Sequence, residues 1–257
     1  MPILLSRVEA GIATLTLNRP EARNALSIAL MTELERALAA TAADAEVKVV
    51  VLAANGPAFC AGHDLKEMRG LDGRDAVAAV FALCSRVMTA IVRHPRPVIA
   101  RVHGMATAAG CQLVASCDLA YASDSARFAT PGVNIGLFCS TPMVALSRAV
   151  GRKQAMEMLL SGQPVDAATA AAWGLVNRAV APGELDAEVA AMAGLIAAKS
   201  PLTVKVGKEA FHRQLEMGLD AAYAYTAEVM TANMLARDAA EGIDAFLEKR
   251  PPHWTGC

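Results

Sequence analysis

Hydrophobic and polar residues alternate near the start of the chain and then give way to a helical repeat. Residues 11–18 (GIATLTLN) alternate with period two, which predicts a strand with one buried face. From Leu26 onward leucines recur at four-residue spacing, which predicts a helix over residues 27–43. Ser27 is suited to cap that helix through its side-chain oxygen.

Two apolar, β-branched runs follow, and each predicts a largely buried strand. They cover residues 47–54 (VKVVVLAA) and 97–102 (PVIARV). A helix is predicted between them over residues 74–92. The segment of small residues over 105–116 has about the length of a helix. Residues 118–122 (DLAYA) predict a further short strand.

Helical patterns dominate from Thr141 to the end of the chain. Pro201, Asp220 and Arg237 mark the predicted starts of three late helices. No linker separates them from the mixed strand and helix region. We therefore expect these helices to form a docked tail or an oligomerisation element, and not a free domain.

Composition narrows the class of protein. A hydrophobic fraction of 54% against 19% charged residues excludes a disordered chain, and 257 residues fit one large domain. The formal net charge of -1 gives no electrostatic reason to expect a nucleic-acid partner. The apolar stretch at 105–122 is too polar to span a bilayer, and residues 1–11 carry no secretory signal. These features predict a cytoplasmic protein without a membrane span.

The six cysteines show no CxxC pair and no histidine at metal spacing. We expect free thiols and no bound metal. Motifs of the types GxGxxG, GxxxxGK[ST], GxSxG and HExxH are also missing from the sequence, so dinucleotide, P-loop, α/β-hydrolase and zincin sites have no motif support.

Two segments place small residues where a strand passes into a helix. They are 58–68 (AFCAGHDLKEM) and 104–113 (GMATAAGCQL). Such turns leave backbone N–H groups unpaired, so two of them could converge on one carbonyl oxygen as an oxyanion hole. The spacing alone equally allows glycines that serve only packing.

The chain resembles the enoyl-CoA hydratase/isomerase (crotonase) family. The resemblance is carried, in order, by Leu17–Leu26, Phe59–Leu65, Gly104–Leu113, Cys117–Asp118, Phe128–Pro131, Gly136, Ala149–Gly151 and Ala172–Val176. It implies an α/β crotonase-like spiral of ββα units. It also implies a core over residues 1–195, a helical trimerisation region over residues 196–257, and trimers or dimers of trimers.

The same resemblance implies acyl-CoA thioesters as ligands, in fatty-acid metabolism, with coenzyme A as part of the substrate and no separate cofactor. The two oxyanion N–H donors fall on Ala61 and Ala109, and Arg23 and Lys66 fall near the CoA phosphates. The remaining implied substrate-binding positions are His63, Asp64 and Leu65, of which Asp64 also suits a helix cap.

The acidic residues that the family uses for chemistry are replaced. The two hydratase glutamate positions hold Gln112 and Gly132, and the acid position of dienoyl isomerases holds Ser140. A carboxamide orients water but cannot accept its proton at neutral pH, and each missing acid or base is worth about 10²–10⁴ in rate. We expect weak or absent hydration, which leaves open whether the chain is an enzyme.

Two alternatives remain at this stage. One is an active hydratase or acyl-CoA thioesterase that uses water held by Gln112, a nucleophile at Ser140 or Cys139, or a loop histidine as base. The base candidates on loops are His63, Asp64 and His103. The other alternative is a non-catalytic regulatory or structural member of the family.

Overall fold

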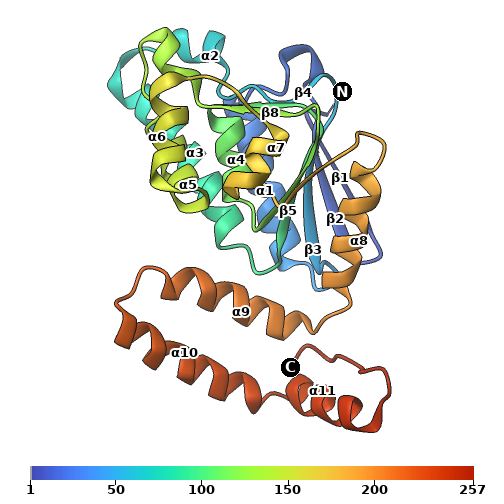
Figure 1. Cartoon of the computed structure of the whole chain (residues 1–257). Helices are drawn as coiled ribbons and strands as arrows, with labels where there is room; N and C mark the ends of the chain where they lie inside the picture. Colours follow the sequence, from blue (N-terminus) through green and yellow to red (C-terminus); the bar gives the residue numbers. More distant parts are fainter. Residues whose placement is uncertain (1) are drawn as a thin grey trace.

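The computed structural model describes residues 2–257, which form two sheets surrounded by helices (Figure 1). The larger sheet has the strand order β1-β2-β3-β5-β7-β10, and the smaller has the order β4-β6-β8-β9. The strands are β1 (Leu4–Glu9), β2 (Ile12–Leu17), β3 (Val49–Ala54), β4 (Ala58–Cys60), β5 (Val98–Val102), β6 (Met105–Thr107), β7 (Leu119–Ser123), β8 (Arg127–Ala129), β9 (Val165–Asp166) and β10 (Arg178–Val180).

Helices follow the strands in a regular order and then continue alone. They are α1 (Ile28–Ala43), α2 (Leu65–Arg69), α3 (Gly73–Val92), α4 (Ala109–Ser116), α5 (Pro142–Ala149), α6 (Arg152–Ser161), α7 (Ala167–Trp173), α8 (Leu185–Ala197), α9 (Pro201–Gln214), α10 (Leu219–Met234) and α11 (Arg237–Glu248). Two 3₁₀ turns, Pro20–Ala22 and Pro131–Ile135, complete the set.

The chain repeats a unit of two strands and a helical segment. In each unit the first strand (β3, β5, β7) lies in the larger sheet and the second (β4, β6, β8) lies in the smaller one. Equivalent strands of successive units pair in parallel, as β3 with β5 and β4 with β6. This arrangement is the crotonase-like spiral predicted from the sequence.

The core lies on both faces of the larger sheet. On one face, Leu30, Leu34 and Leu38 of α1 are fully or almost fully buried together with Val87 and Ile91 of α3. On the other face α8 covers the strands through a smaller cluster, which contains Val49, Val51, Ile99, Tyr121, Leu185, Val189 and Ala193. Ser27 accepts a hydrogen bond from the Leu30 N–H, which confirms the predicted cap of α1.

The last three helices lie apart from this core (Figure 1). Ser200 caps α9 through the Thr203 N–H, and Pro201 occupies its first turn, as the sequence predicts. α10 contains no buried residue. The predicted boundary at residue 195 falls within α8, which ends at Ala197.

Several details differ from the sequence expectations, among them the short strands β9 and β10 in the part predicted to be helical. β1, which pairs antiparallel with β2, was not expected. The predicted helix over 105–116 is divided into β6 and α4, because Ala108 between them adopts φ 50° and ψ -117°, which no helix contains.

By length and composition, α3 is long and apolar enough to cross a membrane, and α8 with α9 qualifies only if that bent pair is counted as one span. The inward side chains of α3, including Leu83, Cys84 and Val87, are buried against the core. This packing is typical of a core helix.

Candidate functional site

The two turns that the sequence singled out lie side by side at one edge of the smaller sheet. β4 and β6 are parallel neighbours, with Cys60 opposite Ala106, so the residues after both strands leave the sheet together. A Cβ built on Gly62 would lie 3.0 Å from the Cβ of Ala108 and 3.5 Å from the amide nitrogen of Ala109. Gly62 has φ +87°, so this close approach requires glycine for both space and conformation.

The first turn leaves a different N–H free from the one expected. The Ala61 N–H donates to the carbonyl oxygen of Arg23 at 3.1 Å, so it is already used within the chain. The assignment of Ala61 as an oxyanion donor is therefore wrong. Two residues further along, the His63 N–H donates to no acceptor within residues 2–257, because the neighbouring bonds from Leu26 to Gly62 and from Asp64 to Leu26 bypass it.

The second turn presents the N–H of Ala109. This residue is fully buried and begins α4, and its N–H has no acceptor among the described residues. A buried N–H without an acceptor costs about 1–3 kcal/mol. Ala108 directs this N–H through its rare backbone conformation, which itself costs about 1–3 kcal/mol at a non-glycine residue.

Close packing fixes the start of α4 against β4. A Cβ on Gly110 would lie 2.2 Å from the carbonyl oxygen of Cys60, so only glycine fits there. The Ala108 N–H also donates to the Ala129 carbonyl oxygen at 2.9 Å, which ties the turn to the end of β8. The position of the Ala109 N–H is thus set by three strands of the smaller sheet.

The His63 side chain was expected as a substrate contact and, in one alternative, as a loop base. Its ring packs edge-on against Phe81 of α3, with the centroids 5.5 Å apart. Its Nε2 is buried and has no hydrogen-bond partner within residues 2–257. Burial lowers the pKa of His63 below its ordinary value, which favours a neutral ring at neutral pH.

Asp64 caps α2, as its sequence position suggested. Its carboxylate accepts the N–H groups of Lys66 and Glu67 and pairs with the Arg19 guanidinium at 3.1 Å. Burial alone would raise its pKa, but the Arg19 hydrogen bond and charge and the helix N–H groups together lower the pKa below the usual range. The Asp64 carboxylate therefore has a structural role, as the charged cap of α2 next to the turn.

Arg23 and Lys66 are both exposed near the turn, and neither forms an ion pair within the described residues. The backbone of Arg23 contacts Ala61 directly through the bond given above, and Lys66 stands in the first turn of α2. Leu65 beside it is exposed as well. Two cations without carboxylate partners therefore flank the turn after β4.

Gln112 and Gly132 stand at the two positions where the family glutamates are expected to be replaced, and neither side chain is titratable. Gln112 is 5% exposed, and the Cys84 thiol lies 3.9 Å from its Oε1. A Cβ on Gly132 would lie 2.7 Å from the carbonyl oxygen of Leu137 and 2.9 Å from the Cys139 sulfur. A longer side chain at position 132 therefore requires the segment 137–139 to move.

Ser140 and Cys139 lack the activation that a nucleophile needs. The Ser140 hydroxyl is exposed and lies 3.4 Å from the Phe138 carbonyl oxygen, and no imidazole or carboxylate of residues 2–257 is hydrogen-bonded to it. Cys139 is buried, and burial raises the pKa of its thiol. His103 instead bonds to the Gly56 carbonyl oxygen at 2.8 Å. Within residues 2–257 no group of three or more His, Cys, Asp or Glu side chains is placed to hold a metal ion.

Comparison with known proteins identifies close relatives. The model of the family described as enoyl-CoA hydratase/isomerase matches residues 7–257. Enoyl-CoA hydratase domain-containing protein 3, mitochondrial, from Homo sapiens is 50% identical over 245 residues, which cover 95% of this chain and 81% of that protein. The Rattus norvegicus protein of the same name is 48% identical, over 97% of this chain and 83% of its own length.

Solved structures agree with this result. A crystal structure of enoyl-CoA hydratase from Mycobacterium smegmatis superposes with a TM-score of 0.97 at 57% identity, covering 99% of both chains. The crystal structure of the human domain-containing protein 3 gives a TM-score of 0.96 at 49% identity, covering 98% of this chain and all of that one. The prediction of a cytoplasmic protein is contradicted, because the curated relatives at 46–50% identity are named mitochondrial.

Proposed function

The chain belongs to the enoyl-CoA hydratase/isomerase family, and from this premise we propose that it binds acyl-CoA thioesters at the paired turns after β4 and β6. The observation that carries the proposal is the pair of N–H groups on His63 and Ala109 that lack acceptors within the described chain. Gly62 lets the two turns approach, so both donors can reach one oxygen. A thioester carbonyl is the acceptor that fits two such donors.

Arg23 and Lys66 are proposed to contact the phosphates of coenzyme A. Both are exposed cations at the turn that supplies the first donor, which supports this role. Replacing either by alanine is expected to weaken binding of free CoA by about twofold to fivefold, the range for solvent-exposed charge contacts, and to reduce its salt dependence. Arg7→Ala on β1 is the matched control, and equal affinities in all variants would remove these two residues from the site.

Conventional hydration is proposed to be weak or absent. Gln112 cannot take a proton from water, and Gly132 leaves no room for the second acid without a shift of residues 137–139. The His63 ring does not replace these acids in the proposal, because its Nε2 is buried and the ring packs against Phe81. Binding and polarisation of the thioester are therefore proposed without efficient addition of water.

The proposal is tested by mixing the purified protein with crotonyl-CoA. Absorbance of the conjugated thioester, release of free thiol and heat of binding are followed together. Binding without loss of conjugation or release of thiol is the expected result. Rapid loss of conjugation would show a working hydratase, thiol release would show a thioesterase, and no binding would reject the proposed ligand.

We further propose that a second copy of the chain covers the exposed face of α9–α11, in a homotrimer or a dimer of trimers. Leu235 and Phe246 are 82% and 83% exposed in the single chain. Tyr223 and Met230 of α10 are exposed as well, and this amount of exposed apolar side chain supports an interface between subunits. Light scattering at several protein concentrations tests this, and a monomer at all concentrations would contradict it.

A further inference from the structure

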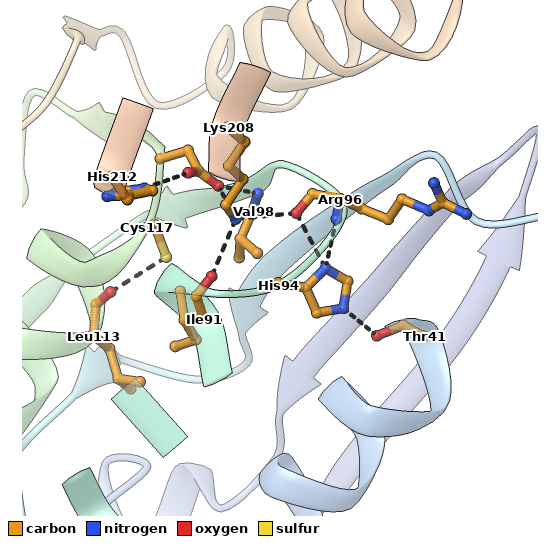
Figure 2. A network of polar contacts seen from close by, with 10 residues as sticks. Thr41, Ile91, His94, Arg96, Val98, Leu113, Cys117, Lys208 and His212 are labelled. Carbon is orange, nitrogen blue, oxygen red and sulfur yellow. Dashed lines mark hydrogen bonds and ion pairs between the residues drawn. The ribbon is translucent and has the colours of Figure 1, made fainter. Parts of the chain in front are cut away.

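A buried polar network joins α9 to the carboxyl end of α4, the helix whose first residue supplies the Ala109 N–H (Figure 2). Lys208 of α9 donates to Asp118 Oδ2 at 2.7 Å and to the carbonyl oxygens of Ile91 and Arg96, each at 3.1 Å. The side chains of Lys208 and Asp118 are 7% and 17% exposed. His212, one turn further along α9, lies 3.4 Å from the other carboxylate oxygen of Asp118.

Asp118 lies where the two ends of the segment that forms the second turn come together. It follows α4 directly, after Cys117, and its N–H donates to the Val98 carbonyl oxygen at 2.9 Å. Its Oδ2 also accepts the Val98 N–H at 2.7 Å. The segment leaves this point along β5, turns at Ala108 and returns along α4, so both of its ends meet at Asp118.

Lys208 binds to three elements around this segment. Ile91 lies in the last turn of α3, and Arg96 precedes β5, so the ammonium group joins α3, the start of β5 and the end of α4. α3 also contacts α4 near the site, through Cys84 and Gln112. An eight-residue helix extends about 12 Å, and a packed helix moves as a rigid body, so a shift at Asp118 is carried to Ala109.

We propose that Lys208 is a positioning residue for thioester recognition: by holding Asp118 at the carboxyl end of α4, it fixes the Ala109 N–H at the amino end of the same helix. This inference rests on the proposed function. Lys208 touches no part of the proposed ligand site and acts only through Asp118 and α4. Its location on α9 means that the docking of the C-terminal helices sets the geometry of one oxyanion donor.

The probes are acetyl-CoA and free CoA, which differ by the acetyl group that carries the thioester carbonyl. The ratio of their affinities, measured by calorimetry, reports on the carbonyl contact and not on the CoA contacts. The infrared stretch of a ¹³C-labelled acetyl thioester reports polarisation of the carbonyl directly. In the wild-type protein we expect tighter binding of acetyl-CoA and a shift of this stretch to lower frequency.

Lys208→Met keeps the length of the side chain and removes its charge and donors. We expect the preference for acetyl-CoA over CoA to fall by about tenfold, since small misplacements of a positioned group have effects of this order or larger, and the carbonyl shift to shrink. Lys205→Met is the matched control, because Lys205 lies on the same helix but is exposed. It is expected to leave both readouts unchanged.

The double variant Lys208→Met with Asp118→Asn separates positioning from charge compensation. It removes the unpaired buried carboxylate but keeps an acceptor for the Val98 N–H, so the stability lost in the single variant should return. The thioester preference and the carbonyl shift should stay low, because the tether to α9 is still missing. Recovery of preference together with stability, or no change in Lys208→Met, would overturn the inference. A wild-type protein without preference or shift would reject the proposed function, and the inference with it.

Discussion

The turns after β4 and β6 are completed by contacts within the chain, whereas the C-terminal helices present much of their apolar surface to solvent. Around the turns, Ala109 and Gly110 are buried and glycines allow backbone to touch backbone. Leu235, directly after α10, and Phe246 of α11 are more than 80% exposed. An added Cβ at Gly110 in the first region would clash with backbone, whereas the second region leaves large apolar side chains in contact with solvent.

Two polar clusters help to hold the C-terminal helices, one against the core and one within the region itself. Lys208 joins α9 to the core as described above. Within the C-terminal region, Asp238 accepts hydrogen bonds from the Ser200 hydroxyl at 2.5 Å, from the N–H and hydroxyl of Thr255, and from the Gly256 N–H. Close packing of backbone therefore fixes the first region, whereas a few buried polar groups fix the second.

The largest effect is expected from adding one carbon to the tightly packed region. Gly110→Ala places a Cβ 2.2 Å from the Cys60 carbonyl oxygen, which should destabilise the fold by about 3 kcal/mol and displace the start of α4. Urea unfolding measures the change. Gly194→Ala in α8, where a Cβ meets open space, is the control and should gain up to about 1 kcal/mol. Equal behaviour of both variants would show that the turn is not packed as described.

The polar cluster of the C-terminal region should respond next most strongly. Asp238→Ala leaves the Ser200 hydroxyl and the tail N–H groups without their acceptor, which should cost about 2 kcal/mol. Limited proteolysis is expected to cut residues 198–257 first, while the core stays resistant. Asp220→Ala, an exposed residue in the first turn of α10, is the control. Cleavage of core and tail at the same rate would contradict the separation of the two regions.

The exposed apolar face should matter for assembly and little for the single chain. Leu235→Asp is expected to weaken self-association by at least tenfold, because a charge would enter the proposed interface, and to change unfolding of the monomer by less than about 0.5 kcal/mol. Sedimentation over a concentration series measures the first quantity. Unchanged association would place the interface elsewhere on the molecule.

The smallest change tests the strain at the second turn. Ala108→Gly should stabilise the protein by about 1 kcal/mol or leave it unchanged, because glycine adopts φ 50° and ψ -117° without the penalty that alanine meets. Ala106→Gly in β6, which has no such conformation, should destabilise it and serves as control. A loss of stability in Ala108→Gly equal to that in Ala106→Gly would show that residue 108 is not strained.

Much of the fold could be predicted because its signals are local. The cap of α1 at Ser27, the buried strands β3 and β5, and the start of α9 at Pro201 were each indicated by neighbouring residues and are confirmed. β1 was missed because its side chains are mostly exposed and show no clear alternation. The division at Ala108 was missed because small residues fit a helix, a strand and a turn equally well.

The site was predicted less completely, and for a different reason. The sequence indicated both turns and the cap at Asp64, whereas the replaced acid positions at Gln112 and Gly132 stay a prediction. It did not indicate the unpartnered His63 Nε2, since the environment of that atom depends on Phe81 of α3. A histidine next to a glycine in a strand-to-helix turn was the available signal.

By itself the sequence determined the family and the spiral of ββα units, because these depend on residue types and their order. Only the tertiary structure decided which N–H groups are free. Ala61 is occupied by the carbonyl oxygen of Arg23, and Asp118 is held by Lys208, 90 residues further along the chain. Hydrogen-bond partners that are distant in sequence leave no periodic or local signal, so they become visible only once the packed elements bring them together.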